Sequence, residues 1–264
     1  ENGGGGGGGS KGGGSSGDGG KVSAEDEDTA LFCLDILIAV TLRNRDRIRL
    51  LLPHVYGYLR TIVQSAQTPG PLSERAIFEL LRICQRLLPY KEELAEELLD
   101  SLRLMFALEP AVADAFIERI ARELCVLVQV AAGFIRGAKG WDTICKLLMA
   151  SARHPDAAGH GFEALSLIMA EGVPGGGGGG DGSSGGDGGG GDGGAGVGGG
   201  GGHMRPWNIR ACIEAATAFV DAHQGGEERS VGALALLSAA SNAVGEWCSG
   251  THDDGAMALA AAAA

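Results

Sequence analysis

Apolar residues recur at spacings of three and four along most of the chain, and this periodicity predicts helices. The clearest case is residues 73–108, where Pro89 separates two apolar stripes. Residues at this spacing share one side of a helix with 3.6 residues per turn. Ser73 is the expected N-cap, and Pro89 is expected to end the first helix. The two stripes are Ile77, Leu80, Leu81, Cys84, Leu87 and Leu88, then Leu94, Leu98, Leu99, Leu102, Met105 and Phe106.

The short connection at Pro89 predicts that these two helices are antiparallel. One hairpin cannot bury both of its stripes, so neighbouring hairpins are required to cover them. The expected helix starts at Thr29, Ser73 and Pro110 recur at about 40 residues, the period of two-helix HEAT or armadillo units. No segment alternates as a strand would. We therefore predict an all-α fold, a HEAT/armadillo-like α-solenoid of antiparallel helix hairpins.

The same periodicity predicts helices on both sides of this hairpin. The first is expected through Leu31–Leu42 and the second through Leu50–Val63. Pro53 lies inside the second, where we expect either a kink or a helix that restarts near the proline. A turn is expected at Gly133–Gly140. Later stripes predict helices over Val112–Val128, Trp141–Ala152, Phe162–Met169, Ile209–Val220 and Val231–Trp247.

Glycine is concentrated in two tracts, residues 3–20 and 175–202, which contain too few apolar side chains to repay the entropy of ordering. We expect both tracts to be disordered. The predicted organisation has four parts: a disordered Gly/Ser-rich tail at 1–24, a helical repeat domain at 25–172, a disordered Gly-rich insertion at 173–203, and a continuing helical hairpin with an alanine-rich end at 204–264.

Charge, hydropathy and cysteine usage narrow the class of protein. The net charge of −12 argues against a nucleic-acid partner, because such surfaces need clustered Lys and Arg. No apolar run approaches the ~20 residues of a membrane span. No secretory signal is expected, and a chain that starts without Met is expected to be an internal fragment. The six widely spaced cysteines are interpreted as buried free thiols in a cytosolic protein.

The strongest basic feature is the segment RNRDRIR, in which arginines alternate around Asp46. One interpretation is contact with anionic lipid headgroups, at about 1 kcal/mol per charge near the membrane surface. The other is a solvated corner between the first two helices, with arginines favourable at a helix C-terminus. The second is favoured, because most surface charge runs are of this kind. The candidate membrane or partner contacts are Arg43, Arg45, Arg47 and Arg49.

No pattern of residues indicates an active site. The histidines form no His-Glu-x-x-His motif and no zinc-type set with the cysteines, so neither a metal nor a cofactor is expected. The acidic helix Glu92–Asp100 has paired carboxylates, but we interpret these as exposed positions beside Lys91 and Arg103. We therefore name no catalytic, cofactor-binding or metal-binding residue and expect that these residues are not an enzyme.

Three blocks of sequence carry a resemblance to a known family: FCLDILIAVTLRNRDRI, AIFELLRICQRLLPYKEELAEELLDSL and GWDTICKLLMASARHPDAAGHGFEAL. They resemble the large Arf-type guanine-nucleotide exchange factors of the GNOM class, in the helical homology regions downstream of the exchange domain. The resemblance spans residues 31–172 and resumes weakly at 212–230. Its signature positions, interpreted as structural, are Trp141, Arg153, His154 and Pro155.

The resemblance implies a function in vesicle-mediated transport at Golgi or endosomal membranes. The exchange domain has no counterpart in this sequence, so no catalytic residue can be carried over. What is implied is a regulatory segment that serves membrane recruitment, autoinhibition or dimerisation. Implied partners are an Arf-type small GTPase through the missing exchange domain, a peripheral membrane surface and a second copy of the chain. The alternative is a stand-alone HEAT-like adaptor that binds protein segments.

Overall fold

The computed structural model describes residues 24–170, 202–222 and 226–248, and across these residues the chain is helical with no strand. The predicted all-α class is confirmed for this part of the chain, whereas both predicted glycine-rich disordered tracts lie almost wholly outside it. The α-helices are α1 (Ala24–Arg43), α2 (Ile48–Ser65), α3 (Pro71–Leu87), α4 (Ala95–Ser101), α5 (Pro110–Ala131), α6 (Ala138–Ser151), α7 (Pro155–Met169), α8 (Ile209–Asp221) and α9 (Glu227–Cys248). Short 3₁₀ segments are η1 (Arg45–Arg47), η2 (Glu92–Leu94), η3 (Leu102–Ala107) and η4 (Ala132–Phe134).

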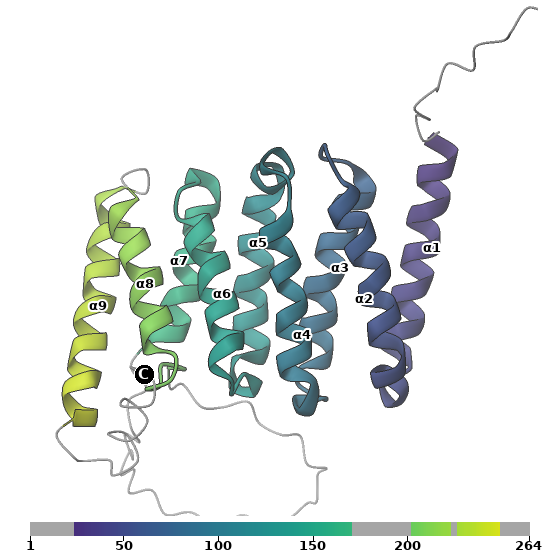
Figure 1. Cartoon of the computed structure of the whole chain (residues 1–264). Coiled ribbons are helices and arrows are strands. Elements are labelled where there is room, and N and C mark those ends of the chain that lie inside the picture. The colour runs from purple at the N-terminus through teal and green to yellow at the C-terminus, as the bar shows by residue number, and fades with distance from the viewer. Residues whose placement is uncertain (1–23, 171–201, 223–225, 249–264) are drawn as a thin grey trace, which may run out of the picture.

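The helices stand side by side in two layers, and successive helices run in opposite directions (Figure 1). One layer holds α1, α3, α5, α7 and α9, in which each helix contacts the next helix of the same layer. The other layer holds α2, α4, α6 and α8, with α4 against α6 and α6 against α8. Each hairpin is therefore covered mainly by the hairpins before and after it, because its own two stripes cannot be buried alone.

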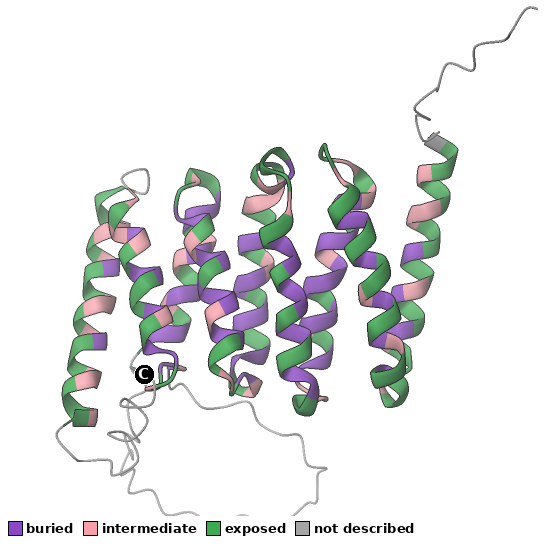
Figure 2. Cartoon of the chain, in the orientation of Figure 1, coloured by how far each residue is buried: buried purple, intermediate pink, exposed green. Residues whose placement is uncertain are grey.

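The core lies between the two layers, where buried residues face one another (Figure 2). All but one of the stripe residues predicted for the central hairpin are buried. The exception is Phe106, which is 46% exposed. The predicted apolar stripe assumes a continuous α-helix, but the chain changes at Leu102 to the 3₁₀ segment η3. With three residues per turn instead of 3.6, the periodicity shifts and Phe106 turns away from the core.

Helix α7 begins at Pro155, well before the stripe predicted from Phe162, and α1 and α3 also begin earlier than predicted. Thr29 is not an N-cap but an interior residue of α1, where its hydroxyl donates to the Glu25 carbonyl at 2.7 Å. Acidic residues before Thr29 fill the first turn, where the helix dipole favours negative charge. Helix α3 begins at Pro71, a favoured first residue, so Ser73 is the third helical residue. The Ser73 hydroxyl still satisfies the helix end by accepting from the Gly70 N–H at 3.1 Å.

Two further boundaries differ from those expected. Pro53 is the sixth residue of a continuous helix α2, so the helix does not restart there. Gly140 lies in the first turn of α6 instead of in the preceding turn. Both departures have the same origin: apolar neighbours hold the helix in place although proline and glycine disfavour helix interiors. Leu52 and Val55 flank Pro53 and are buried.

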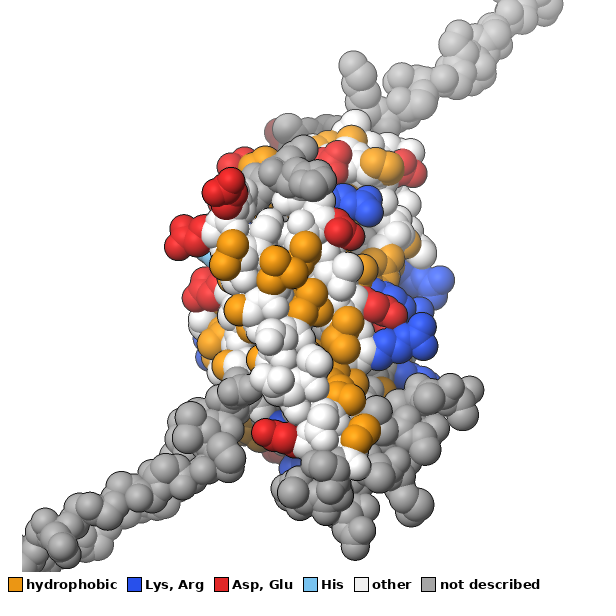
Figure 3. Space-filling view, turned by 90° about the vertical axis from the view of Figure 1, so that its left-hand side faces the viewer, with side chains coloured by type: hydrophobic (Ala, Val, Ile, Leu, Met, Phe, Trp, Pro, Cys, Tyr) orange, Lys and Arg blue, Asp and Glu red, His pale blue; other side chains and the backbone are white. Residues whose placement is uncertain are grey.

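The predicted burial of the cysteines is wrong for the two outermost helices. Cys84, Cys125, Cys145 and Cys212 are buried free thiols, whereas Cys33 on α1 and Cys248 on α9 are exposed. These two helices lie at opposite ends of the described array, and each has a neighbour on one side only (Figure 1). Figure 3 views the α9 end, where hydrophobic side chains remain exposed along the helix, including Val231 and Leu234.

Candidate interaction surfaces

The four predicted arginines lie at the corner between α1 and α2, which we call the arginine corner (Arg43, Arg45, Arg47 and Arg49). Arg43 is the last residue of α1, and Arg45 and Arg47 bound the 3₁₀ segment η1. Arg43 and Arg47 are exposed, and neither forms an ion pair within the described parts of the chain. None of the η1 residues is buried, and the corner presents Arg43 and Arg47 as two solvated cations.

The other two arginines contact the next hairpin. The Arg45 guanidinium carbon lies 4.3 Å from the centroid of the Tyr90 ring, a cation–π distance. Its Nε also donates to the Leu42 carbonyl at 3.3 Å. Arg49 pairs loosely with Glu93 at 3.8 Å. Arg45 and Arg49 thus join the first hairpin to the second, whereas Arg43 and Arg47 are exposed to solvent.

Trp141 lies in the core near the start of α6. It is 1% exposed, and its Nε1–H donates to the Ile135 carbonyl at 2.9 Å. The indole also stacks on the His203 ring with centroids 6.1 Å apart. A buried indole needs such a partner for its donor, and here it is supplied by the chain that leads into α6.

The remaining signature positions lie at the opposite end of α6, in the connection to α7. Pro155 is the first residue of α7, and the His154 carbonyl accepts from the Ala157 and Ala158 N–H groups at 3.1 and 2.8 Å. The His154 imidazole lies 3.6 Å from the Asp114 carboxylate. Arg153 is exposed. The structure therefore separates Trp141 from these three residues, which lie together in the turn between α6 and α7.

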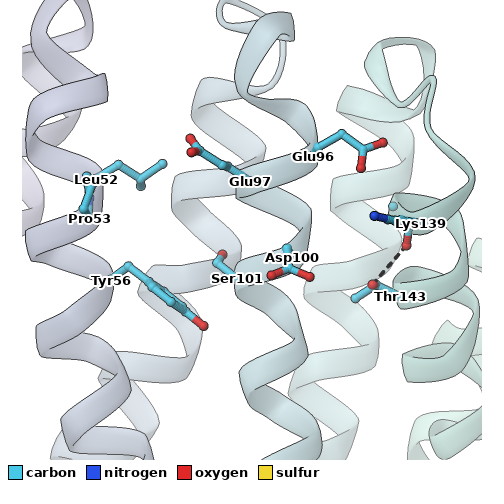
Figure 4. A pocket seen from close by; sticks show the side chains of 10 residues that line it. Leu52, Pro53, Tyr56, Glu96, Glu97, Asp100, Ser101, Lys139 and Thr143 are labelled. Atoms are coloured by element: carbon cyan, nitrogen blue, oxygen red, sulfur yellow. Dashed lines mark hydrogen bonds between the residues drawn. The ribbon is translucent and has the colours of Figure 1, made fainter.

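A groove that sequence reasoning did not anticipate crosses α2, α4 and α6 (Figure 4). Its volume is about 470 Å³. We call it the α2–α4–α6 groove; its lining residues are Leu52, Pro53, Tyr56, Glu96, Glu97, Asp100, Ser101, Lys139, Gly140 and Thr143. The acidic positions were recognised as exposed in the sequence. Their partners on α2 and α6 lie about 40 residues away on either side, so no local pattern could connect them.

The two walls of this groove differ in character. On α2, the Tyr56 ring extends toward α4 beside Leu52 and Pro53 (Figure 4). On α4, the Glu97 side chain extends toward α2 and the Glu96 side chain toward α6, with Asp100 between them (Figure 4). An apolar wall thus faces an acidic wall across the same depression.

The acidic wall is poorly neutralised. Glu96 and Glu97 form no ion pair with any described residue, and Asp100 lies 3.7 Å from Arg103. The Glu96 carboxylate lies against Gly137, just before the first turn of α6, where the helix dipole favours an anion. Lys139 is the cation that lines the groove. The surface therefore keeps a surplus of negative charge.

Two further kinds of group bear on the chemistry of this part of the chain: potential metal ligands and cysteine thiols. No group of three or more potential ligands is close enough to hold a metal ion in that part of the chain. Burial raises the pKa of the Cys84 thiol to about 12 and that of Cys125 to about 11, the latter also through the nearby Glu163 charge. Such thiols stay protonated and unreactive at neutral pH. Among the described helices, none has the length and apolarity to cross a bilayer.

The chain is similar in sequence to segments of several guanine-nucleotide exchange factors. The chain is 45% identical over 228 residues to the ARF guanine-nucleotide exchange factor GNOM of Arabidopsis thaliana, covering 86% of this chain. It is 42% identical over 227 residues to the ARF guanine-nucleotide exchange factor GNL1 of the same plant, again over 86% of the chain. It is 33% identical over 131 residues, 49% of the chain, to the Golgi-specific brefeldin A-resistance guanine nucleotide exchange factor 1 homolog of Caenorhabditis elegans.

These relatives are much longer than the matched segment. The chain spans 14% of the length of each Arabidopsis protein and 7% of the C. elegans protein. No family model matches the chain, and no solved structure matches it significantly.

Proposed function

Because the chain belongs to the GNOM class of ARF guanine-nucleotide exchange factors, we propose that it is a regulatory helical segment of such a factor. The observation that carries this proposal is the 45% identity to GNOM, which extends over 86% of the chain but only 14% of that protein. The segment would serve membrane recruitment, autoinhibition or dimerisation of a protein whose exchange domain lies elsewhere. The layered contacts between successive hairpins support a HEAT-like solenoid as its architecture.

The arginine corner is the proposed contact with the membrane. Arg43 and Arg47 are exposed and unpaired in the described structure, as a contact with anionic headgroups requires. The C. elegans relative is named as a Golgi-specific factor, which supports the Golgi as the compartment, with endosomes as the further candidate. The protein would then be cytoplasmic and peripherally bound to the membrane.

Vesicle sedimentation tests this contact. At about 1 kcal/mol per arginine, replacing Arg43 and Arg47 by alanine should weaken binding to phosphatidylserine-containing vesicles roughly 30-fold at low salt. The matched control replaces Arg86 and Arg122, two exposed arginines on α3 and α5, and should leave binding nearly unchanged. Equal losses in both pairs would show general charge attraction instead of a specific corner.

A nucleotide-exchange assay tests whether the exchange activity lies outside this segment. Because no exchange motif was found in the sequence, the purified chain should not accelerate nucleotide release from an Arf protein, whereas the full-length protein should. Acceleration by the chain alone would contradict a purely regulatory function. The upstream reading frame separates the two competing assignments: an exchange domain there supports the regulatory segment, and its absence supports a stand-alone protein-binding adaptor.

A further inference from the structure

The α2–α4–α6 groove has the two features that an extended basic peptide would need: an apolar wall and an acidic wall. We propose that it binds a segment of a partner protein in which arginine or lysine residues flank one or two large apolar side chains. This inference goes beyond the membrane and exchange-factor assignments and does not depend on either.

The apolar wall would hold the partner's aliphatic or aromatic side chain. Tyr56 is half-buried and presents its ring and hydroxyl to the groove beside Leu52 and Pro53. No hydrogen bond of the Tyr56 hydroxyl is found among the described residues, so it is available to a bound backbone. Tyrosine suits such a position, because it offers a large rigid apolar surface together with a polar tip.

The acidic wall would select the charge of the partner. Glu97 and Asp100 lie one turn apart on α4, so they present two carboxylates along the same side of the groove. Their charge is opposed in the groove by Lys139. A neutral or acidic segment would leave these carboxylates desolvated without compensation, whereas a basic segment would pair with them.

The dimensions fit a short segment better than a globular surface. A volume of about 470 Å³ lies in the range of sites that enclose a few side chains. The groove crosses three successive helices of one layer, and stacked helical hairpins commonly bind extended chains across such a layer.

Fluorescence polarisation with a defined probe tests the proposal. The probe is a labelled nine-residue peptide with three arginines placed around two leucines, titrated with the whole chain at 150 mM salt. Reversing the acidic wall with Glu97→Lys and Asp100→Lys should weaken binding at least tenfold. Lys139→Glu removes the opposing cation and should tighten binding severalfold. All three positions are exposed, so the helices should fold normally, which circular dichroism would check.

Two controls make the result specific. Glu118→Lys with Asp221→Lys changes the net charge equally at exposed positions on α5 and α8, and should alter binding less than twofold. A peptide with glycine in place of both leucines should bind at least tenfold more weakly. The proposal is overturned if the wild-type chain does not bind the probe, if both charge-reversed pairs weaken it equally, or if the glycine peptide binds as well. Dimerisation that occurs without the probe and is abolished by Glu97→Lys would show that the groove binds the arginine corner of a second copy. That result would also overturn the proposal.

Discussion

The indole of Trp141 and the imidazole of His203 stack with their ring centroids 6.1 Å apart and their planes 25° from parallel. Trp141 belongs to the start of α6, whereas His203 lies in the segment that leads to α8. The backbone N–H of His203 also donates to the Ile168 carbonyl, near the end of α7, at 2.8 Å. The stacked pair therefore joins the start of α6 to the segment that leads to α8, and that segment is in turn hydrogen-bonded to α7.

Trp141→Ala should destabilise the chain by about 3–5 kcal/mol, the range for emptying a buried aromatic site. The side chain is 1% exposed, so its removal leaves a cavity beside the stacked His203 ring. Chemical denaturation would measure the loss, and the variant should also become sensitive to protease. Trp141→Phe should cost less than the alanine variant, although it leaves the Ile135 carbonyl without its donor.

Trp207→Ala is the matched control for this experiment. Trp207 is 43% exposed, and its removal should change the free energy of unfolding by less than about 1 kcal/mol. The assignment of Trp141 to the core would be wrong if Trp141→Ala unfolded like the parent chain yet lost binding to vesicles or a partner.

The stacked histidine should make stability depend on pH. Burial, together with the positive charge of Arg205, lowers the pKa of His203 below its ordinary value of 6.5. The unfolded chain then binds a proton more readily than the folded chain, so stability is greatest above pH 6.5 and falls as the pH drops below that value. His203→Phe keeps a ring on Trp141 and should flatten the dependence of the melting temperature between pH 7 and 5.5. An unchanged slope would show that another group controls it.

The helices and most of their buried faces could be predicted from the sequence, because spacing of apolar residues is a local property. The stripe of α3 and the burial of Leu124 on α5 follow directly from it. The starts of α1 and α3 could not be predicted as well. At each start several residues can cap the helix, and the surrounding structure decides between them. For α1 the alternatives are Thr29 and the acidic residues before it, and for α3 they are Gly70 and Ser73.

The groove could not be predicted for a different reason. It depends on how α2 packs relative to α4 and α6, and Tyr56 and Lys139 are far apart in the sequence. Periodicity likewise did not reveal that Cys33 lies on an uncovered side of α1, since a stripe shows which residues are apolar but not whether a neighbouring helix covers them.

Gly140→Ala should destabilise the chain, whereas Gly57→Ala should stabilise it. A methyl group at Gly140 would lie 2.5 Å from the Leu99 Cδ1 atom and 3.2 Å from the Ile135 Cγ2 atom, so the buried Leu99 side chain would have to shift within the core. We expect a cost of about 1–3 kcal/mol, typical of overpacking. Gly57 lies in α2 with nothing within 4 Å of the new methyl group, so the higher helix propensity of alanine should contribute about 0.5–1 kcal/mol. Thermal melts of the two variants should shift in opposite directions, and shifts of the same sign would contradict the packing at Gly140.

Thiol labelling should divide the cysteines into two groups. Cys33 and Cys248 are exposed and should react with iodoacetamide in the native protein within minutes at pH 8. Cys84, Cys125, Cys145 and Cys212 are buried and should react only after denaturation. Burial raises the pKa of Cys84 to about 12, so the reactive thiolate is scarce as long as the site stays closed. Mass spectrometry of labelled peptides would check this, and fast labelling of Cys84 would contradict the packing of α3 on α4.

Removing residues 175–198 should leave the fold intact and raise its stability slightly. The two ends of this connection lie together: a Cβ atom on Gly202 would lie 1.6 Å from the Ala170 carbonyl oxygen, and His203 is hydrogen-bonded to Ile168. A connection of about 7 residues can therefore replace one of about 31 without strain. Two doublings of loop length correspond to ~1 kcal/mol of closure entropy, so the shortened chain should unfold at a slightly higher denaturant concentration.

Gly202 and Arg205 must be kept, because the Arg205 guanidinium donates to the Gly202 carbonyl at 2.9 Å. A marked loss of stability on removing 175–198 would show that the tract packs against the helices, contrary to the sequence-based expectation of disorder.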